Sequence, residues 1–154
     1  LESRLMQLTQ PQVKMKDPKN QTSMNNAIQR LTPLLGGYRS LPGTSDENSS
    51  LKIVAERLVP ALKINTGKDY INFLLRQLKA TQLPAGFTYS EPKQEMIDGQ
   101  PLDYLESAYG ASKKRLYATV RKGFAVLITI EHFKDSDFQE LHEVLEAADL
   151  DYKK

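Results

Sequence analysis

Three tight turns between residues 98 and 123 constrain the fold of this chain more than any other feature. They are Asp98-Gly99, Gly110-Ala111-Ser112 and Lys122-Gly123, and apolar or alternating segments flank each of them. Asp-Gly in particular tolerates positive φ at both positions, as a two-residue hairpin requires. Three successive hairpins predict an antiparallel meander of four strands. We expect these strands at residues 87–97, 100–109, 115–121 and 124–130.

The last two of these segments differ in how they bury their side chains. In residues 115–121, small and aliphatic side chains alternate with Tyr117 and Thr119, which predicts one buried face. Residues 124–130 are apolar at nearly every position. That pattern is typical of a central strand covered on both faces.

A helix is predicted on each side of the meander. Thr66 and Asp69 form a capping box for a helix over about residues 68–82. Its apolar stripe, spaced three or four residues apart, consists of Ile71, Leu74, Leu75 and Leu78. Pro84 and Gly86 end this helix.

The chain is expected to close with an amphipathic helix over residues 138–149. Ser136 or Asp137 can cap it, because each is followed three residues later by Gln139 or Glu140. The buried stripe consists of Phe138, Leu141, Val144, Leu145 and Ala148, and the opposite face is acidic.

The first fifty residues are less regular than the rest. Leu1–Gln10 has a short helix-like apolar stripe, and Ser23 can cap a second helix. Pro33 and Gly36-Gly37 limit the length of that helix. Its apolar positions are Met24, Ala27, Ile28, Leu31 and Leu35.

These elements predict an α+β fold in a single domain, residues 1–154, with a partly helical N-terminal segment over 1–50 and the α+β core over 51–150. The core would begin with an extended strand over 51–64, broken near Pro60, and follow the order β-α-β-β-β-β-α. We expect both helices on one face of the antiparallel sheet, which leaves the other face for a partner.

Composition removes several functional classes. The chain has no cysteine, which excludes disulfides, thiol nucleophiles and cysteine-ligated zinc. The net charge of only +2 does not favour binding to nucleic acid or to an anionic membrane. No segment approaches the roughly 18 apolar residues that would suggest a membrane span.

Four local patterns could carry chemistry. His132 and His142 each lie beside a glutamate, but no HxH or HxxxH spacing supports a metal site, and we interpret both as boundary or surface histidines. Asp135 and Asp137 lack the glycine and distal glutamate of a calcium loop. Gly67-Lys68 lacks the remaining glycine of a phosphate-binding loop and is followed by an aspartate.

The fourth pattern is the basic run Lys113-Lys114-Arg115, with Arg121-Lys122 at the other end of the same predicted strand. Basic groups near tyrosines on a sheet are found in RNA-binding surfaces. Charged hairpin ends also keep turns solvated and block edge association, and the acidic final helix would oppose a polyanion. We therefore do not expect nucleic acid as the partner, and we expect no cofactor, no metal and no catalytic residue from the motifs present.

The segment from about Leu51 to Leu150 resembles the PsbP/DcrB-like group of α+β domains. The resemblance rests on the strand–helix order, on the meander segments around Asp98-Gly99, Arg115–Val120 and Gly123–Thr129, and on a closing helix that begins at Asp137-Phe138. It implies an accessory or binding protein without a shared catalytic residue, and its bacterial members are often exported or lipid-anchored. A curved sheet like that of cystatins or ketosteroid isomerase has a similar list of elements and stays open.

Three functional hypotheses follow. The first is a non-enzymatic accessory or binding domain that presents a sheet face to a protein partner or small ligand. Its expected contact residues, which are large, polar-capable and sheet-facing, are Tyr104, Tyr109, Arg115 and Tyr117. The second is a small-molecule pocket protein or enzyme, which would need an enclosed cavity holding a carboxylate or histidine with a shifted pKa. The third is an RNA-binding module.

The expected location is the periplasm or cell envelope, and a cytoplasmic location stays open. The printed sequence starts at Leu1. We interpret that start as an exported protein whose leader is missing, and a lipid anchor on the missing part also stays open.

Overall fold

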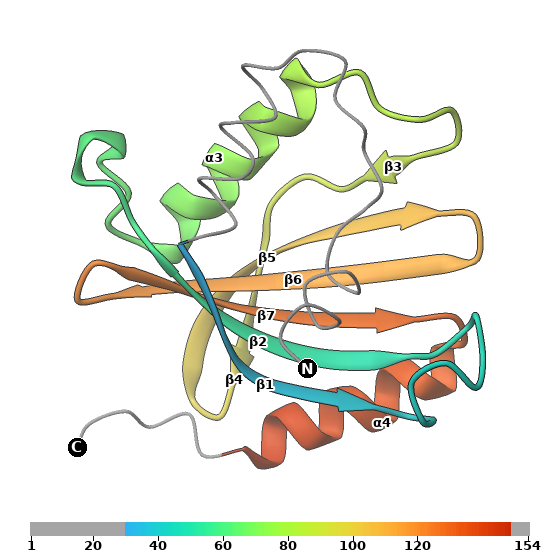
Figure 1. The fold of residues 1–154 in the computed structure, drawn as a ribbon. Helices are drawn as coiled ribbons and strands as arrows, with labels where there is room; N and C mark the ends of the chain where they lie inside the picture. The colour runs from blue at the N-terminus through green and yellow to red at the C-terminus, as the bar shows by residue number, and fades with distance from the viewer. Residues whose placement is uncertain (1–29, 149–154) are drawn as a thin grey trace. The chain divides into compact units, whose positions relative to one another are not determined.

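The computed structural model describes residues 30–148, which are built on a seven-stranded antiparallel sheet (Figure 1). The strand order is β1-β2-β7-β6-β5-β3, and β4 pairs with the other half of β5. The elements are β1 (Leu31–Tyr38), β2 (Ser50–Arg57), the 3-10 helix η1 (Pro60–Leu62), α3 (Gly67–Ala80), β3 (Thr88–Tyr89), β4 (Lys93–Ile97), β5 (Gln100–Tyr109), β6 (Ser112–Arg121), β7 (Phe124–His132) and α4 (Asp135–Ala147).

The predicted α+β class and the predicted hairpins are confirmed. Asp98 and Gly99 both have positive φ, at 46° and 69°, and they join β4 to β5. Lys122 and Gly123 join β6 to β7 in the same way, at 48° and 80°. Because both central residues have positive φ, the twist of each turn matches that of its flanking strands.

The segment expected to be one strand over residues 87–97 is two strands, β3 and β4. Both pair with β5, and the interruption between them contains Pro92, which cannot donate a ladder hydrogen bond. Ser90 bridges the gap, because its N–H donates to the carbonyl oxygen of Glu106 at 2.9 Å and its Oγ accepts from the N–H of Glu106 at 3.1 Å.

The prediction of a helix after Ser23 is wrong for the second half of that segment. Residues 31–38 form the edge strand β1, which pairs with β2, and a register shift between Pro33 and Leu35 accommodates the proline. Proline and the glycine pair disfavour a helix here, and cross-strand hydrogen bonds override the spacing of the leucines. The helix predicted at Leu1–Gln10 and the start of the second helix lie outside the described residues.

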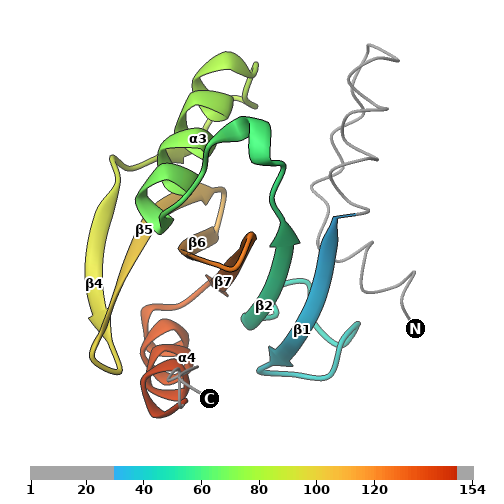
Figure 2. The same ribbon diagram turned by 90° about the vertical axis from the view of Figure 1, so that its left-hand side faces the viewer.

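The two helices lie on opposite faces of the sheet, not on one face as expected (Figure 2). The reason is visible in β6, where neighbouring side chains point to opposite faces and both are buried. Tyr117 is 0% exposed and packs with α4, whereas Ala118 is 1% exposed and packs with α3. The single buried face predicted for residues 115–121 is corrected accordingly, since β6 is covered on both sides.

The capping box predicted for α3 is confirmed. Thr66 Oγ1 accepts from the N–H of Asp69 at 3.1 Å, and the Asp69 carboxylate accepts from the N–H of Thr66 at 3.0 Å. Gly67 opens the helix directly against β6: a Cβ at this position would lie 2.2 Å from the carbonyl oxygen of Ala118. The glycine therefore permits close packing of α3 on the sheet, which supports interpreting Gly67-Lys68 as a helix start.

The cap predicted for α4 is placed differently. The helix begins at Asp135, and its N-cap residue is Lys134, which makes no side-chain cap hydrogen bond. Asp137 points to the β1–β2 loop instead, where its carboxylate accepts from Ser49 Oγ at 2.7 Å and pairs with Arg39. The Asp137 side chain, which the local capping rule had assigned to the helix end, therefore makes tertiary contacts instead.

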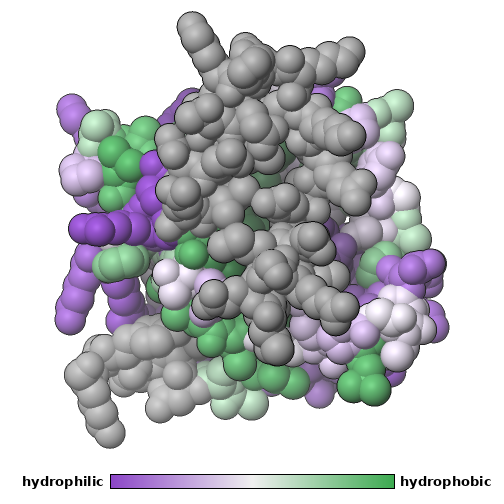
Figure 3. All heavy atoms as spheres, viewed as in Figure 1, coloured by the Kyte–Doolittle hydropathy of each residue, from purple (hydrophilic) through white to green (hydrophobic). Residues whose placement is uncertain are grey.

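The described surface mixes polar and apolar side chains. Figure 3 shows both kinds interspersed on the part of one face that the described residues form. No helix among residues 30–148 is long and apolar enough to cross a membrane. The large apolar side chains that stay exposed come from several elements and loops, and are Leu34, Leu35, Leu41, Leu62, Met96, Tyr109, Phe124 and Val144.

Candidate binding site

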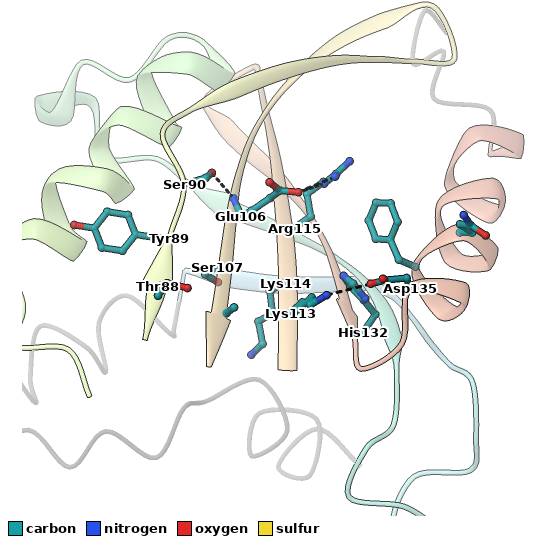
Figure 4. A pocket seen from close by; sticks show the side chains of 13 residues that line it. Thr88, Tyr89, Ser90, Glu106, Ser107, Lys113, Lys114, Arg115, His132 and Asp135 are labelled. Carbon is teal, nitrogen blue, oxygen red and sulfur yellow. Dashed lines mark hydrogen bonds and ion pairs between the residues drawn. The ribbon is translucent and has the colours of Figure 1, made fainter. Parts of the chain in front are cut away.

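An open hollow of about 530 Å³ lies on the α4 face of the sheet, between β3 and the first turn of α4 (Figure 4). Strand alternation places Glu106, Arg115 and His132 on this face. The pairing register puts Glu106 opposite Arg115, and Lys113 opposite His132. Thr88 on β3 and Gln139 on α4 line the two sides.

Arg115 is the central charged group of this site. Its guanidinium donates to Glu106 Oε1 from Nη2 at 2.7 Å and from Nε at 3.1 Å, and to Glu95 Oε2 at 3.0 Å. Burial alone would lower the pKa of Arg115, but interactions with Tyr117 and Glu106 raise it. The arginine is therefore held charged and in one orientation by two carboxylates.

Glu106 is held ionised from two sides. Its other oxygen accepts from Lys93 Nζ at 3.0 Å. Burial raises the pKa of Glu106, but the hydrogen bonds from Lys93 and Arg115 outweigh that effect and hold the pKa below its usual value. A carboxylate of this kind serves as an electrostatic anchor and not as a proton donor near neutral pH.

Aromatic rings enclose the arginine. The guanidinium lies 4.6 Å from the ring centroid of Tyr104 and 4.5 Å from that of Phe138, distances at which cations are attracted to ring faces. Tyr117 lies beneath them, with its ring 5.3 Å from that of Tyr104 and its hydroxyl donating to Glu95 Oε2 at 2.7 Å. Burial, together with the bond to Glu95, raises the pKa of Tyr117.

His142 connects this cluster to α4. Its Nε2 lies 2.8 Å from Glu95 Oε1 and its Nδ1 lies 3.7 Å from Glu146 Oε1. A carboxylate can only accept, so Nε2 carries the proton of the bond to Glu95. Glu95 therefore links three elements, since it accepts from Arg115 and Tyr117 on β6 and from His142 on α4.

The two histidines do not meet. Phe138 contacts both rings, with centroid distances of 5.0 Å to His132 and 5.4 Å to His142. Within residues 30–148 no group of three or more histidine, aspartate or glutamate side chains is placed to hold a metal ion. Asp135 and Asp137 also diverge, because the side chain of Asp135 is 84% exposed while that of Asp137 is 8% exposed.

The structure brings together three of the four predicted contact residues. Tyr104, Arg115 and Tyr117 form one cluster, in which Tyr117 is fully buried and supports the arginine from below. Tyr109 lies apart at the end of β5 and is 54% exposed.

Sequence reasoning missed Glu95 and Glu106, and it did not connect His142, interpreted as a boundary or surface histidine, with this cluster. The positions of the two glutamates could have been predicted from the strand register. Counting back from the Gly110-Ala111 turn places Glu106 opposite Arg115, and counting back from the Asp98-Gly99 turn puts Glu95 opposite Leu102 on the next strand. His142 had no such signal, because the face on which α4 packs does not follow from the helix sequence.

Each residue of the basic run has an acidic partner. Lys113 Nζ lies 3.1 Å from Asp135 and Lys114 Nζ lies 3.4 Å from Glu131. With Arg115 held by Glu95 and Glu106, the run presents no unbalanced stripe of positive charge. Nucleic-acid binding depends on such a stripe, so the geometry does not favour it.

Comparison with known proteins shows similarity in fold only. No known protein family matches the sequence, and no curated protein matches it. Among solved structures, a protein of unknown function from Pseudomonas aeruginosa, described as a candidate regulator, is similar with a TM-score of 0.50 and 16% identity, over 74% of this chain and 81% of that one.

A PsbP structure is also similar. The solution structure of PsbP from the cyanobacterium Synechocystis sp. PCC 6803 matches with a TM-score of 0.42 and 12% identity, over 89% of this chain and 94% of that one. The PsbP-like resemblance predicted from the sequence is thus matched by a weak likeness in fold. Neither likeness carries information about function.

Proposed function

We propose that this chain is a non-catalytic accessory domain, and that it binds a protein partner in the hollow beside α4. The observation that carries the proposal is that the hollow is open and its floor is already fixed. Arg115 at that floor is bonded to two carboxylates and enclosed by aromatic rings. A surface ordered before binding loses little side-chain entropy when a partner arrives, which favours recognition.

The charged groups of the site are arranged for binding and not for proton transfer. A general acid or base needs a pKa near the working pH. Glu106 has its pKa held below the usual range by Lys93 and Arg115, and Tyr117 has its pKa raised by burial and Glu95. Both shifts move the pKa values of these groups further from pH 7. Each group therefore keeps a single charge state near neutral pH.

The small-molecule alternative is less well supported by the shape of the site. It requires an enclosed cavity, whereas the hollow is open. A second depression near Pro101 and Val126 has a volume of only about 30 Å³, the size of a single water molecule. A protein segment fits an open, mixed polar and apolar surface better than a compact metabolite does.

We further propose that the domain acts in the periplasm or cell envelope. The chain has no cysteine, so an oxidising compartment is compatible with its folding. Fractionation of cells that express the full-length gene tests it. Recovery in the cytosol alone would contradict this location while leaving the binding proposal in place.

Retrieval of a partner by the tagged full-length protein, followed by mass spectrometry, tests the function. Gln139 lies exposed at the side of the hollow, and Gln77 lies exposed on α3, on the other face of the sheet. We expect Gln139→Arg to abolish retrieval of a specific protein and the matched control Gln77→Arg to leave it unchanged. Equal retrieval by both variants would contradict the proposed site.

A further inference from the structure

His132, at the wall of the hollow, has a ring nitrogen that can accept a hydrogen bond. The residue is 8% exposed, and its Nδ1 lies 3.1 Å from the carbonyl oxygen of Lys134. A carbonyl oxygen only accepts, so Nδ1 carries the proton of this bond, and Nε2 of the neutral ring is an acceptor. Among residues 30–148 no group donates to Nε2, and the side chain lines an open hollow (Figure 4). A group that occupies the hollow can therefore supply the donor.

The charged side chains of the hollow are paired with one another. Together with their ion-pair partners, the lining residues comprise four cations, Lys93, Lys113, Lys114 and Arg115, and four carboxylates, Glu95, Glu106, Glu131 and Asp135. A charged occupant would find no unpaired counter-charge in this set and would have to compete with an existing pair. The lining therefore favours an uncharged occupant.

The N-terminus of α4 does not alter this balance. The first N–H groups of a helix have no partner inside the helix and carry the positive end of its dipole. Asp135 and Asp137 lie in the first turn of α4, where negative charge offsets the dipole. The helix end thus adds no net attraction for an anion.

Apolar surface lies beside the acceptor. Phe138 on α4 lines the hollow, and its ring centroid is 5.0 Å from that of His132 with an angle of 51° between the ring planes. Ala108 adds apolar lining from β5. Aromatic rings that meet in tilted or offset arrangements attract one another beyond the effect of buried area. A flat apolar group can therefore pack on this lining while its donor reaches His132.

We infer that the hollow takes an uncharged hydrogen-bond donor of the protein partner, the indole N–H of a tryptophan, which donates to His132 Nε2. This inference rests on the proposed function and names the group that the site recognises. Indole donates without accepting, and it carries its N–H on a flat apolar ring. It therefore matches the free acceptor, the paired charges and the Phe138 surface together. Tryptophan is also enriched among the residues that contribute most to binding at protein interfaces.

Nuclear magnetic resonance of the full chain with isotope-labelled histidine rings tests the acceptor first. The sequence contains two histidines, His132 and His142, so each ring serves as a reference for the other. Spectra are recorded at about pH 8, above the range in which histidines in general take up a proton. We expect the proton on Nδ1 in His132 and on Nε2 in His142, which bonds to Glu95. A proton on Nε2 of His132 would overturn the inference.

Indole and N-methylindole are the matched probes, because they share one ring and differ in the donor. We expect indole to shift the Nε2 signal of His132 in a saturable way. It should bind roughly three- to tenfold more tightly than N-methylindole, the worth of one hydrogen bond between neutral groups. The signals of His142 should move little. Equal binding of the two probes, or equal shifts of both histidines, would overturn the inference.

The ring signals are assigned by their loss in His132→Gln, or by the loss of the other set in His142→Gln if the first variant does not fold. Gln139→Arg, which places a larger cation at the side of the hollow, should weaken the response of His132 to indole. Gln77→Arg on α3 is the matched control and should leave the response unchanged. An equal response of these two variants would contradict binding of indole in the hollow.

Two further probes test the chemical class of the occupant. Indoleacetate adds a carboxylate to the same ring and should bind no more tightly than indole, because the lining has no unpaired cation for it. Tighter binding of indoleacetate would overturn the assignment to an uncharged group. Propionamide presents the donor of an asparagine or glutamine side chain. A stronger response to propionamide than to indole would overturn the assignment to tryptophan.

The inference can fail while the proposed function survives. If partner retrieval is lost in Gln139→Arg but the His132 signals do not respond to indole, the inference is wrong and the hollow binds a partner through another group. If neither effect appears, the hollow itself is not the binding site and both proposals fail.

Discussion

Glu95 holds three elements together at the scale of single residues, because its carboxylate accepts hydrogen bonds from β6 and α4 while it lies on β4. Its partners are Arg115, Tyr117 and His142. Removing the charge leaves a largely buried guanidinium with one carboxylate instead of two. Partly buried networks lose more free energy when one member is removed than exposed pairs do.

We therefore expect Glu95→Gln to lower the free energy of unfolding by about 1–3 kcal/mol. Chemical denaturation measures the change. Glu91→Gln is the matched control, since Glu91 is exposed just before β4, and it should stay within about 0.5 kcal/mol of the unchanged protein. Equal stability of the two variants would show that the Glu95 network is not a structural anchor.

Glu106 makes stability depend on pH in the acid range. Its folded pKa lies below its usual value of 4.5, so the folded state is favoured above that pH and the advantage is lost as pH falls through the lower folded pKa. The side chain is 35% exposed, so solvent screening keeps the contribution below about 1 kcal/mol.

Unfolding free energies of the unchanged protein and of Glu106→Gln, measured from neutral to acid pH, check this. We expect the difference between the two to shrink as pH falls below 4.5. A difference that grows on acidification would contradict the assigned direction of the pKa shift.

At the scale of elements, the packing of α3 on β6 depends on the missing side chain of Gly67. Alanine in an exposed helix interior usually stabilises relative to glycine by about 1 kcal/mol. Here the added Cβ would meet the backbone carbonyl of Ala118 at 2.2 Å, and backbone cannot move aside as a flexible side chain can. The local propensity and the tertiary contact therefore act in opposite directions.

The tertiary contact should dominate. We expect Gly67→Ala to destabilise the protein by about 2 kcal/mol or more, as overpacked sites do. Lys68→Ala, one residue further along the helix and exposed, should be nearly neutral. Thermal or denaturant unfolding of both variants measures the change in stability. A Gly67→Ala variant more stable than the unchanged protein would contradict the close approach of Gly67 to the Ala118 carbonyl.

Elements whose signals are local were predictable from the sequence. The Asp98-Gly99 and Lys122-Gly123 turns and the Thr66–Asp69 capping box depend on residues within four positions of one another. The strand β1 was not predictable, because its leucine spacing suggested a helix and only pairing with β2 decides the conformation. Long-range contacts also decided the face on which each helix packs.

The residues of the site also divide into those that local signals predict and those that long-range contacts place. Tyr104, Arg115 and Tyr117 lie on strands whose register the turns fix, so their grouping follows from the meander. His142 and Phe138 reach that group from α4, and no local pattern specifies where α4 docks. The hollow exists because α4 and β3 leave part of the sheet between them uncovered, a property of the assembled fold.

At the scale of the whole molecule, we propose that a partner binds in the hollow on the α4 face. In-cell photo-crosslinking tests it most directly, with a photoreactive residue placed at Gln139, at Thr88 across the hollow, or at Gln77 on α3. We expect Gln139 and Thr88 to yield the same crosslinked protein and Gln77 not to yield it. Crosslinks to that protein from Gln77 alone, or equally from all three positions, would contradict it.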